Sequence, residues 1–290
     1  MMNEIVILSG KGGTGKTSIS AAFATLNNNT IVADCDVDAA DLYLILNPKN
    51  YLEKNFITGY TAVIDYNTCT NCGLCIEYCR FEAISLINGK VDISELSCDG
   101  CKLCSRICPS NSIQMKPSDK SLWFIGNYRN GKMVHARLYP GEENSGKLVN
   151  VVRENARRTA VESGWETIII DGPPGIGCPV ISSVTGTNTA IIITEPTNSG
   201  FHDLKRVLKV TANHKVKTFV VINKYDLNKS ISCIIENWCT ENNIQVVGKI
   251  LFDEQIVEAM INCKSITEWK PDSQTSNEIR RIWAVINQMS

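Results

Sequence analysis

The residues GKGGTGKT, at positions 10–17, constrain the fold of this chain more than any other stretch. They fit the phosphate-loop pattern G-x-x-x-x-G-K-[ST], follow the apolar run IVILS and precede TSISAAFATL, which has helical apolar spacing. This order of strand, glycine-rich loop and helix suits phosphate binding, because loop N–H groups and the helix N-terminus together surround phosphate oxygens. The stretch therefore predicts an α/β domain that binds a phosphorylated ligand.

Within the loop, Lys16 is expected to reach the terminal phosphates, and the Thr17 hydroxyl is expected to bind Mg²⁺. The expected phosphate-binding residues are Gly10, Gly12, Gly13, Thr14, Gly15, Lys16, Thr17 and Ser18.

Short apolar runs recur between helical segments and predict the core of a parallel sheet. The expected strands are 4–8, 30–33, 167–170, 189–194, 218–222 and 245–251. Continuous runs such as TIIID and FVVIN suit strands that are buried on both faces. We therefore expect an α/β fold with a mostly parallel sheet flanked by helices. A chain of 290 residues, 43% of them hydrophobic, is long enough for this core and a small added unit.

Carboxylates follow two of the expected strands. Asp34, Asp36 and Asp38 occur in VADCDVD, and Asp171 occurs in IIIDGPPG. An Asp after a strand is often a turn former or a helix cap. Because the carboxyl ends of parallel strands meet beside the phosphate loop, a role near Mg²⁺ is favoured here.

A cysteine-rich stretch, 56–115, interrupts this pattern and predicts an inserted domain, so that 1–55 and 116–290 form the phosphate-loop domain. The spacing C-x2-C-x2-C-x3-C occurs twice, 29 residues apart, as in two-cluster bacterial ferredoxins, where the fourth cysteine of each run binds the other cluster. The expected ligand sets of two 4Fe–4S clusters are Cys69, Cys72, Cys75 with Cys108, and Cys98, Cys101, Cys104 with Cys79. Zinc is the competing ligand, although zinc modules usually pair two separated C-x2-C knuckles. Arg80 stands where ferredoxins usually have proline after the first quartet.

Further motifs extend the pattern outside the insert. They are Lys11 in the phosphate loop, VADCDVDAADL, DGPPG at 171–175, TEPT at 194–197, NKYD at 223–226 and LFDEQIVEA at 251–259. With these motifs the chain resembles the MinD/ParA superfamily of deviant phosphate-loop ATPases, which includes the nitrogenase iron protein and the Mrp-type cluster carriers. The whole arrangement resembles those members that contain an inserted ferredoxin domain.

The resemblance implies roles for individual residues. Lys11 would reach across a nucleotide-sandwich dimer, Asp36 would orient the attacking water, and Asp171 would lie beside Mg²⁺. The catalytic set is then Lys11, Lys16, Asp36 and Asp171, and the Mg²⁺ set is Thr17, Asp36 and Asp171.

The base of the nucleotide is less clearly specified. Asn223 resembles the family asparagine that contacts adenine, but Asp226 completes an N-K-x-D string like that of GTPases. A carboxylate accepts hydrogen bonds from guanine and has no such donors in adenine, while Asp226 is equally suited to cap the following helix. ATP is favoured because the loop and both aspartate motifs match the ATPase branch, and GTP stays open.

These features predict an iron–sulfur ATPase that couples Mg-ATP hydrolysis to electron transfer through two 4Fe–4S clusters. Its expected partners are a second copy or a paralogue, in a homodimer or heterodimer, and a redox or iron–sulfur acceptor protein. One alternative is a cluster assembly or carrier ATPase. Another is a MinD/ParA-like spatial regulator, whose membrane helix would be SNEIRRIWAVINQMS, with Ile279, Ile282, Trp283 and Ile286 at helical spacing. A core-packing helix has the same spacing.

The net charge and the N-terminal residues argue against a nucleic-acid-binding protein and against a secreted or membrane-anchored one. The net charge of -1 gives no basic field for nucleic acid, and Arg153, Arg157 and Arg158 are expected to be solvated helix charges. MMNEIVILSG has no basic leader and too short an apolar run for a signal peptide, so a cytoplasmic protein without a stable membrane anchor is expected.

Five cysteines lie outside the quartets, Cys35, Cys178, Cys233, Cys239 and Cys263, and most are expected in the core. Cys178, in DGPPGIGC, resembles the cysteine with which the nitrogenase iron protein holds a cluster across its dimer. A buried thiol is the alternative at that position.

Overall fold

The computed structural model describes residues 2–57, 59–140, 142 and 145–289. The chain divides into two units. Unit 1 comprises Met1–Glu53, Trp123–Arg137 and Ser145–Ser290, and unit 2 comprises Lys54–Leu122 and Leu138–Asn144. Unit 2 therefore contains all eight cysteines of the two quartets and extends beyond the 56–115 stretch on both sides.

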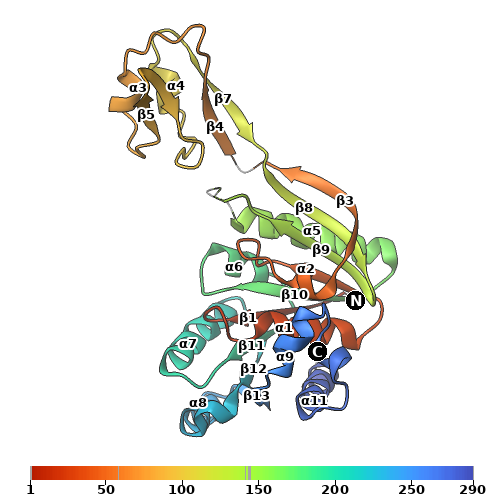
Figure 1. Cartoon of the computed structure of the whole chain (residues 1–290). Coiled ribbons are helices and arrows are strands. Elements are labelled where there is room, and N and C mark those ends of the chain that lie inside the picture. Colours follow the sequence, from red (N-terminus) through yellow and green to blue (C-terminus); the bar gives the residue numbers. More distant parts are fainter. Residues whose placement is uncertain (1, 58, 141, 143–144, 290) are drawn as a thin grey trace. The chain divides into compact units, whose positions relative to one another are not determined.

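Unit 1 is built on a sheet whose strands run in the order β13-β12-β11-β1-β10-β2-β9-β8-β3 in the described part of the chain (Figure 1). The strands are β1 (Asn3–Ser9), β2 (Thr30–Asp34), β3 (Lys49–Phe56), β8 (Ser121–Tyr128), β9 (Gly131–Arg137), β10 (Thr167–Pro174), β11 (Thr189–Thr194), β12 (Lys217–Asn223) and β13 (Gln245–Ile250). Each pair from β13 through to β9 is parallel. The expected α/β fold with a mostly parallel sheet is confirmed.

The six expected strands are found as β1, β2, β10, β11, β12 and β13, with ends that differ by a few residues. Strands β3, β8 and β9 were not expected. Strand β3, KNYLEKNF, has six exposed residues of eight, so its sequence lacks the apolar run by which buried strands are recognised. The two residues between β8 and β9 make a hairpin, which adds two strands to the edge of the parallel core.

Helices cover both faces of the sheet. They are α1 (Lys16–Leu26), α2 (Leu42–Leu46), α5 (Ser145–Ser163), α6 (Cys178–Val184), α7 (Asn198–Asn213), α8 (Lys229–Glu241), α9 (Gln255–Ile261), α10 (Ile266–Trp269) and α11 (Gln274–Met289), with a 3-10 turn, η1 (Tyr225–Asn228). Helices α1, α10 and α11 pack together over one face, while α5 and α6 pack together over the other (Figure 1). The parallel part of the sheet is therefore buried on both sides, as its continuous apolar strands require.

The apolar face of α11 belongs to the core of unit 1. Ile279, Ile282 and Ile286 are buried, and Trp283 is 5% exposed and stacks on Phe23 of α1 with ring centroids 4.8 Å apart. The interpretation of this segment as a membrane-binding helix is therefore wrong, because its apolar residues are covered by the protein itself. Nowhere in the described chain is a helix both long and apolar enough to cross a bilayer.

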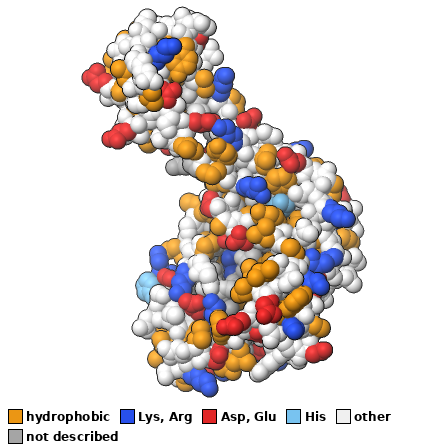
Figure 2. Space-filling model, in the orientation of Figure 1, with side chains coloured by type: hydrophobic (Ala, Val, Ile, Leu, Met, Phe, Trp, Pro, Cys, Tyr) orange, Lys and Arg blue, Asp and Glu red, His pale blue; other side chains and the backbone are white. Residues whose placement is uncertain are grey.

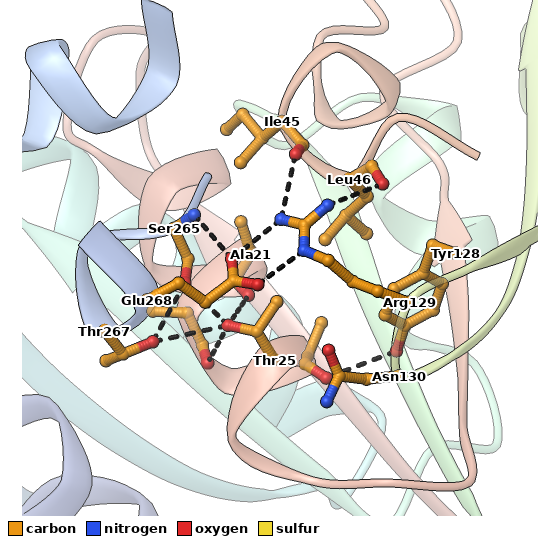
Figure 3. A network of polar contacts seen from close by, with 12 residues as sticks. Ala21, Thr25, Ile45, Leu46, Tyr128, Arg129, Asn130, Ser265, Thr267 and Glu268 are labelled. Carbon is orange, nitrogen blue, oxygen red and sulfur yellow. Dashed lines mark hydrogen bonds and ion pairs between the residues drawn. The ribbon is translucent and has the colours of Figure 1, made fainter. Parts of the chain in front are cut away.

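A polar network joins the β8–β9 turn to the helices on the α1 face (Figure 3). The Arg129 guanidinium donates to the carbonyl oxygens of Ile45 (3.2 Å) and Leu46 (2.9 Å) at the end of α2, and its Nη2 lies 2.7 Å from Glu268 Oε2. Glu268 also accepts from the Ser265 N–H (2.9 Å) in the capping box of α10. The hairpin is thereby held by charge-assisted bonds.

Unit 2 consists of short elements around a small core. They are β4 (Gly59–Ile64) paired with β7 (Ile113–Ser118), β5 (Ile84–Ile87) paired with β6 (Lys90–Ile93), α3 (Leu74–Glu77) and α4 (Leu103–Ile107). Its buried core residues are Ala62, Ile64, Cys75, Ile84, Val91 and Ile113, against which five more quartet cysteines pack. The two quartets thus surround the only core that is found in the described residues of this unit.

We expect the replacement Trp283→Ala to lower the free energy of unfolding of unit 1 by about 3–5 kcal/mol, because it removes a buried aromatic ring that stacks on Phe23. Denaturant unfolding measures this change. The exposed neighbour Asn287→Ala is the control and should change stability by less than about 0.5 kcal/mol. Equal stabilities of the two variants would contradict the assignment of α11 to the core.

Candidate nucleotide site and cysteine cavities

The carboxyl ends of four parallel strands meet at one edge of the unit 1 sheet. Strand β1 leads into the phosphate loop, β2 and β12 end at Asp34 and Asn223, and Asp171 lies three residues before the end of β10. Asp171 is the direct register partner of Asp34. Gly15 has φ 88°, and a Cβ there would lie 2.3 Å from Asn223 Nδ2, so glycine is required where the loop passes this strand end.

The phosphate-loop lysine is held by two aspartates. Lys16 Nζ lies 2.9 Å from Asp171 Oδ1 and 3.6 Å from Asp36 Oδ2, and its side chain is only 6% exposed. Asp171 also accepts from the Thr17 hydroxyl (3.0 Å) and from the buried Ser20 hydroxyl (2.7 Å). The structure therefore brings Lys16, Thr17, Asp36 and Asp171 into one site. Ser20 was missed, although it lies one helical turn after Lys16, on the same face of α1.

Burial and crowding of carboxylates set the electrostatics of the site. Burial, together with the nearby Asp171, raises the pKa of Asp34 well above its usual range. Burial likewise raises the pKa of Asp36 to about 6, although Lys16 opposes the shift. Burial alone would lower the pKa of Lys16, but the carboxylates of Asp171 and Asp36 outweigh it, so the pKa of Lys16 is raised. The site holds a surplus of acidic groups over one buried cation.

A cleft of about 430 Å³ opens beside these residues. Its lining includes Gly12, Gly13, Thr14, Gly15, Lys16, Thr17, Ser18, Asp36 and Asn223. Gly10 is not in the lining and packs against Asp203, and Asp38 is exposed outside it. The apolar side chains of Leu251, Phe252 and Ile256 also line the cleft. The cleft thus joins a polar phosphate end to an apolar wall that suits a base.

Asp226 does not line the cleft and instead bonds to the backbone of a neighbouring loop. Its Oδ1 accepts from the Phe252 N–H (2.7 Å), which holds the loop after β13. The cap of α8 is Asn228, whose side chain accepts from Ile231 N–H (3.1 Å), so the interpretation of Asp226 as that cap is wrong. Asn223 does line the cleft and donates from Nδ2 to Thr14 O (2.8 Å).

Lys11 contacts residues of its own chain. Its Nζ lies 2.6 Å from Glu195 Oε1 and 3.1 Å from the Ser199 hydroxyl. Glu195 also lies 3.6 Å from Lys224 Nζ, which donates to Gly13 O (3.0 Å). The role of Glu195 was not predicted, and its place inside the TEPT motif is the sequence signal that was available.

The quartet cysteines line two cavities of unit 2. One is lined by Cys69, Cys72, Cys75 and Cys108, and the other by Cys79, Cys98, Cys101 and Cys104. Each cavity therefore joins three cysteines of one quartet with the fourth of the other. The thirteen cysteines, all in the described part of the chain, form no disulfide. In the same described part, no three Cys, His, Asp or Glu side chains are close enough to hold a single metal ion.

The remaining cysteines divide into two classes. Cys35 and Cys239 are buried, as expected for core residues, while Cys178, Cys233 and Cys263 are exposed. The expectation that most of them lie in the core is therefore wrong for the exposed three. Cys178 begins α6, directly after the β10 loop.

Two of the three arginines of α5 are engaged inside unit 1. Arg153 is buried, pairs with Glu4 and donates to the Thr185 carbonyl (2.7 Å), and Arg157 Nη2 donates to Glu4 Oε2 (3.0 Å). Only Arg158 is exposed as expected. On the face drawn in Figure 2, cationic and anionic side chains intermingle. These arginines therefore give no support to a nucleic-acid interface.

A family model described as the CobQ/CobB/MinD/ParA nucleotide binding domain matches residues 5–266. The chain belongs to this family. With its complete phosphate loop, it is a P-loop ATPase of the MinD/ParA family.

Individual proteins resemble this family member over most of its length. An uncharacterized protein of Methanocaldococcus jannaschii is 34% identical over 229 residues, which cover 78% of this chain and 79% of that protein. An uncharacterized ATP-binding protein of the same organism is 23% identical over 98% of this chain and 87% of its own length. The septum site-determining protein MinD of Pyrococcus horikoshii, solved with Mg-ADP, superposes with a TM-score of 0.60 and 17% identity, covering 100% of this chain and 97% of that one. This last likeness shows the shared fold.

We expect Asp36→Asn to reduce ATP hydrolysis by about a hundredfold or more, because it removes a carboxylate from the phosphate end of the cleft. The same change should raise the melting temperature of the nucleotide-free protein at pH 7.5. With a folded pKa of about 6, Asp36 binds its proton more tightly in the native state than in the unfolded state. Its contribution to stability is therefore lost as pH rises from about 4 to about 6.

The stability gain of Asp36→Asn should shrink at pH 5, where the wild-type carboxyl is already largely protonated. Asp272→Asn, at an exposed position outside the cleft lining, is the matched control for both activity and melting temperature. A variant that hydrolyses ATP at the wild-type rate would remove Asp36 from the catalytic set.

For base selection, we expect Asp226→Ala to weaken ATP and GTP binding to the same extent, by about 1 kcal/mol or roughly fivefold in Kd. The substitution frees the Phe252 loop without removing a group from the cleft lining. Competition binding with both nucleotides measures the two constants, and Asp226→Asn, which keeps the acceptor oxygen, is the control. A selective loss of GTP binding would instead assign Asp226 to guanine recognition.

Proposed function

We propose that this chain is an iron–sulfur ATPase in which Mg-ATP binding and hydrolysis control electron transfer through two 4Fe–4S clusters to a partner protein. One observation carries the proposal. A single chain combines a complete phosphate loop with two cavities, each lined by three cysteines of one quartet and the fourth of the other. The known crossed ligation of two-cluster ferredoxins supports this reading of the cavities.

The donor set of unit 1 fits Mg²⁺. Thr17, Asp36 and Asp171 supply one hydroxyl and two carboxylates, which are hard oxygen ligands of the kind that Mg²⁺ prefers. Behind them, Asp34 Oδ2 is fully buried and has no hydrogen-bond partner among the described groups. A divalent cation and its bound water would relieve this acidic surplus. The same cation would neutralise the charge of the phosphates.

The donor set of unit 2 fits clusters better than single zinc ions. Four thiolates that bind one zinc ion lie about 2.3 Å from it and hence close to one another. No group of three candidate ligands at single-ion spacing is found among the described residues, although four cysteines line each cavity. A four-iron cluster fills a wider space between its ligands. When bound, the clusters would supply one-electron transfer, which no amino-acid side chain of the site provides.

The residues of unit 1 would divide the work of hydrolysis. The phosphate loop and the N-terminus of α1 would hold the phosphates with backbone N–H groups. Lys16 would exchange part of its contact with Asp171 for the terminal phosphate, which releases that carboxylate to the metal. Asp36 would then orient the attacking water. Lys11 would leave Glu195 to reach the phosphates of a second copy in a nucleotide-sandwich dimer.

The order of the chain supports coupling between the two activities. The cysteine stretch enters after Asp36 and ends before Asp171, so it is inserted between the two carboxylates that would respond to the terminal phosphate. A displacement of either carboxylate on hydrolysis would reach the insert through the chain segments that join the insert to unit 1. The acceptor would then receive an electron only at a defined stage of the ATPase cycle.

We expect anaerobically purified protein to contain about eight irons per chain and two interacting 4Fe–4S signals in EPR after reduction with dithionite. The midpoint potentials or line shapes should change with Mg-ATP or a non-hydrolysable analogue, because nucleotide binding rearranges the contacts of Lys16 and Asp36. Lys16→Ala is the matched variant. It should keep its iron and sulfide but lose the response to nucleotide.

Each other outcome has a definite meaning. Stoichiometric zinc without iron would overturn the redox proposal. Clusters that ignore nucleotide would leave two independent modules in one chain. Rapid and complete transfer of iron and sulfide to an apo acceptor protein would favour the carrier alternative.

A further inference from the structure

We propose that the cluster held by Cys69, Cys72, Cys75 and Cys108 has the higher reduction potential of the two, because the Ser110 hydroxyl donates a hydrogen bond to its Cys108 ligand. This inference rests on the proposed function and adds a direction to it. The electron would pass from the cluster of Cys79, Cys98, Cys101 and Cys104 to the cluster that contains Cys108.

The internal repeat of unit 2 makes the two clusters comparable position by position. The residues after Cys108 read PSNSI, and those after Cys79 read RFEAI. With the repeat offset of 29 residues, Ser110 corresponds to Phe81, and Ser112 corresponds to Ala83. The chain therefore places two hydroxyl groups after one fourth cysteine and none at the matching positions after the other.

The two serines form a short relay that ends on the sulfur. Ser112 N–H donates to Cys108 Sγ (3.3 Å), and the Ser110 Oγ lies 3.6 Å from the same sulfur. Ser110 Oγ and Ser112 Oγ are 2.8 Å apart, and Ser112 is completely buried. A metal-bound Cys108 is a thiolate, which has no proton to give, so Ser110 must be the donor in that bond. Its own lone pair then accepts from Ser112, and this polarises the bond to sulfur.

The matching loop of the other set offers a different surrounding. Among the residues that the structure describes, no hydrogen bond to Cys79 Sγ is found. The guanidinium of the exposed Arg80 lies 5.2 Å from the centroid of the Phe81 ring, and Ala83 is buried. The segment after Cys79 thus has a ring and a methyl group at the two positions where the segment after Cys108 has hydroxyl groups.

Hydrogen bonds to ligand sulfur raise the potential of a cluster because reduction adds negative charge to it. Each 4Fe–4S core gains one electron and changes from a net charge of 2+ to 1+, with no bond made or broken, at the expense of a low-potential one-electron donor. Donors that point at the sulfurs stabilise the reduced state more than the oxidised state. The cluster with the serine relay should therefore accept the electron first.

Charged groups near the other cluster act in both directions. Lys102 lines its cavity, and its Nζ lies 4.0 Å from the Tyr60 ring centroid, but Asp99 lines the same cavity. These two charges have opposite effects on the potential, and among the described residues that line this cavity Lys102 is the only cation. A substitution of the serine alone changes the hydroxyl without changing any charge, so it isolates the proposed cause.

The experiment is a potentiometric titration of anaerobic, full-length protein, followed by EPR, on the wild type and on Ser110→Ala. The variant should shift the higher of the two midpoints downwards by about tenfold in the reduction equilibrium, or about 59 mV for one electron, and leave the lower midpoint in place. Ser110→Thr keeps the hydroxyl and should restore the wild-type value. Ser105→Ala is the matched control, because the Ser105 hydroxyl donates to the Lys102 carbonyl (3.0 Å) and not to a sulfur.

Iron and sulfide content is measured on every sample, which separates this inference from the proposed function. A wild type without about eight irons would overturn the proposed function itself. Full clusters in Ser110→Ala with both midpoints unchanged, or with a shift of the lower midpoint only, would overturn the inference. If the alanine variant loses a cluster, Ser112→Ala, which removes the polarising hydroxyl but keeps the backbone N–H, should give a smaller downward shift of the same midpoint. No shift in that variant would also overturn the inference.

Discussion

The buried contact between Lys16 and Asp171 is the interaction on which the nucleotide site depends. Removing an ammonium and a carboxylate from water carries a penalty of several kcal/mol for each ion, which their attraction offsets only with good geometry and further hydrogen bonds. Here Ser20 and Thr17 donate those further bonds to Asp171. Asp36 adds a second carboxylate at 3.6 Å from the lysine. The charge of Lys16 is thus balanced by two carboxylates that lie beside the phosphate loop.

This arrangement follows from the topology of the sheet. Strands β1, β2 and β10 are parallel neighbours, so their carboxyl ends bring the phosphate loop, Asp34 and Asp171 to one edge. The paired ends of β2 and β10 place two carboxylates in register, and burial then raises the pKa of Asp34. The acidic surplus is a consequence of strand order, which brings these carboxylates to one edge of the sheet. A site with this concentration of carboxylates beside a phosphate loop is suited to a cation with a polyphosphate.

Much of this architecture was predictable from the sequence. The features that were predicted wrongly or not at all share physical causes. Long β-branched runs identify the buried parallel strands, but β3 is mostly exposed and gives no apolar signal. A helical stripe such as that of α11 fits a membrane surface or a core equally well, and only the partner Phe23 decides between them. Likewise, spacing along α5 cannot show that Glu4, on a distant strand, neutralises Arg153. The sequence therefore did not predict the contacts between segments that are distant along the chain.

In the cysteine-rich unit, the sequence is informative through the spacing of its cysteines, because that spacing is a local property of the chain. Among its described residues, the core cluster of the unit contains six buried side chains, one of them Cys75, and the sheets found there are two-stranded pairs. Such small cores rarely stabilise a domain without disulfides or metal. No disulfide forms among the described cysteines, and five other quartet cysteines pack against the core. Under the proposed function, the stability of this unit should therefore come largely from the clusters that its thiolates would hold, as in small metal-binding domains.

The place of the insertion gives the proposed coupling a covalent route. Strand β2, which ends at Asp34, pairs with β9, and β8 and β3 follow β9 in the same sheet. The chain enters the cysteine unit from β3 and returns through β8, and a second segment of that unit follows β9, so these connections belong to strands of the sheet that holds Asp34. A sheet transmits displacement well because its strands are tied by regular hydrogen bonds and close packing. Hydrolysis that moves the carboxylates beside β2 would therefore act on the same strands to which the cysteine-rich unit is connected, and a separate ferredoxin without this connection would have no such control.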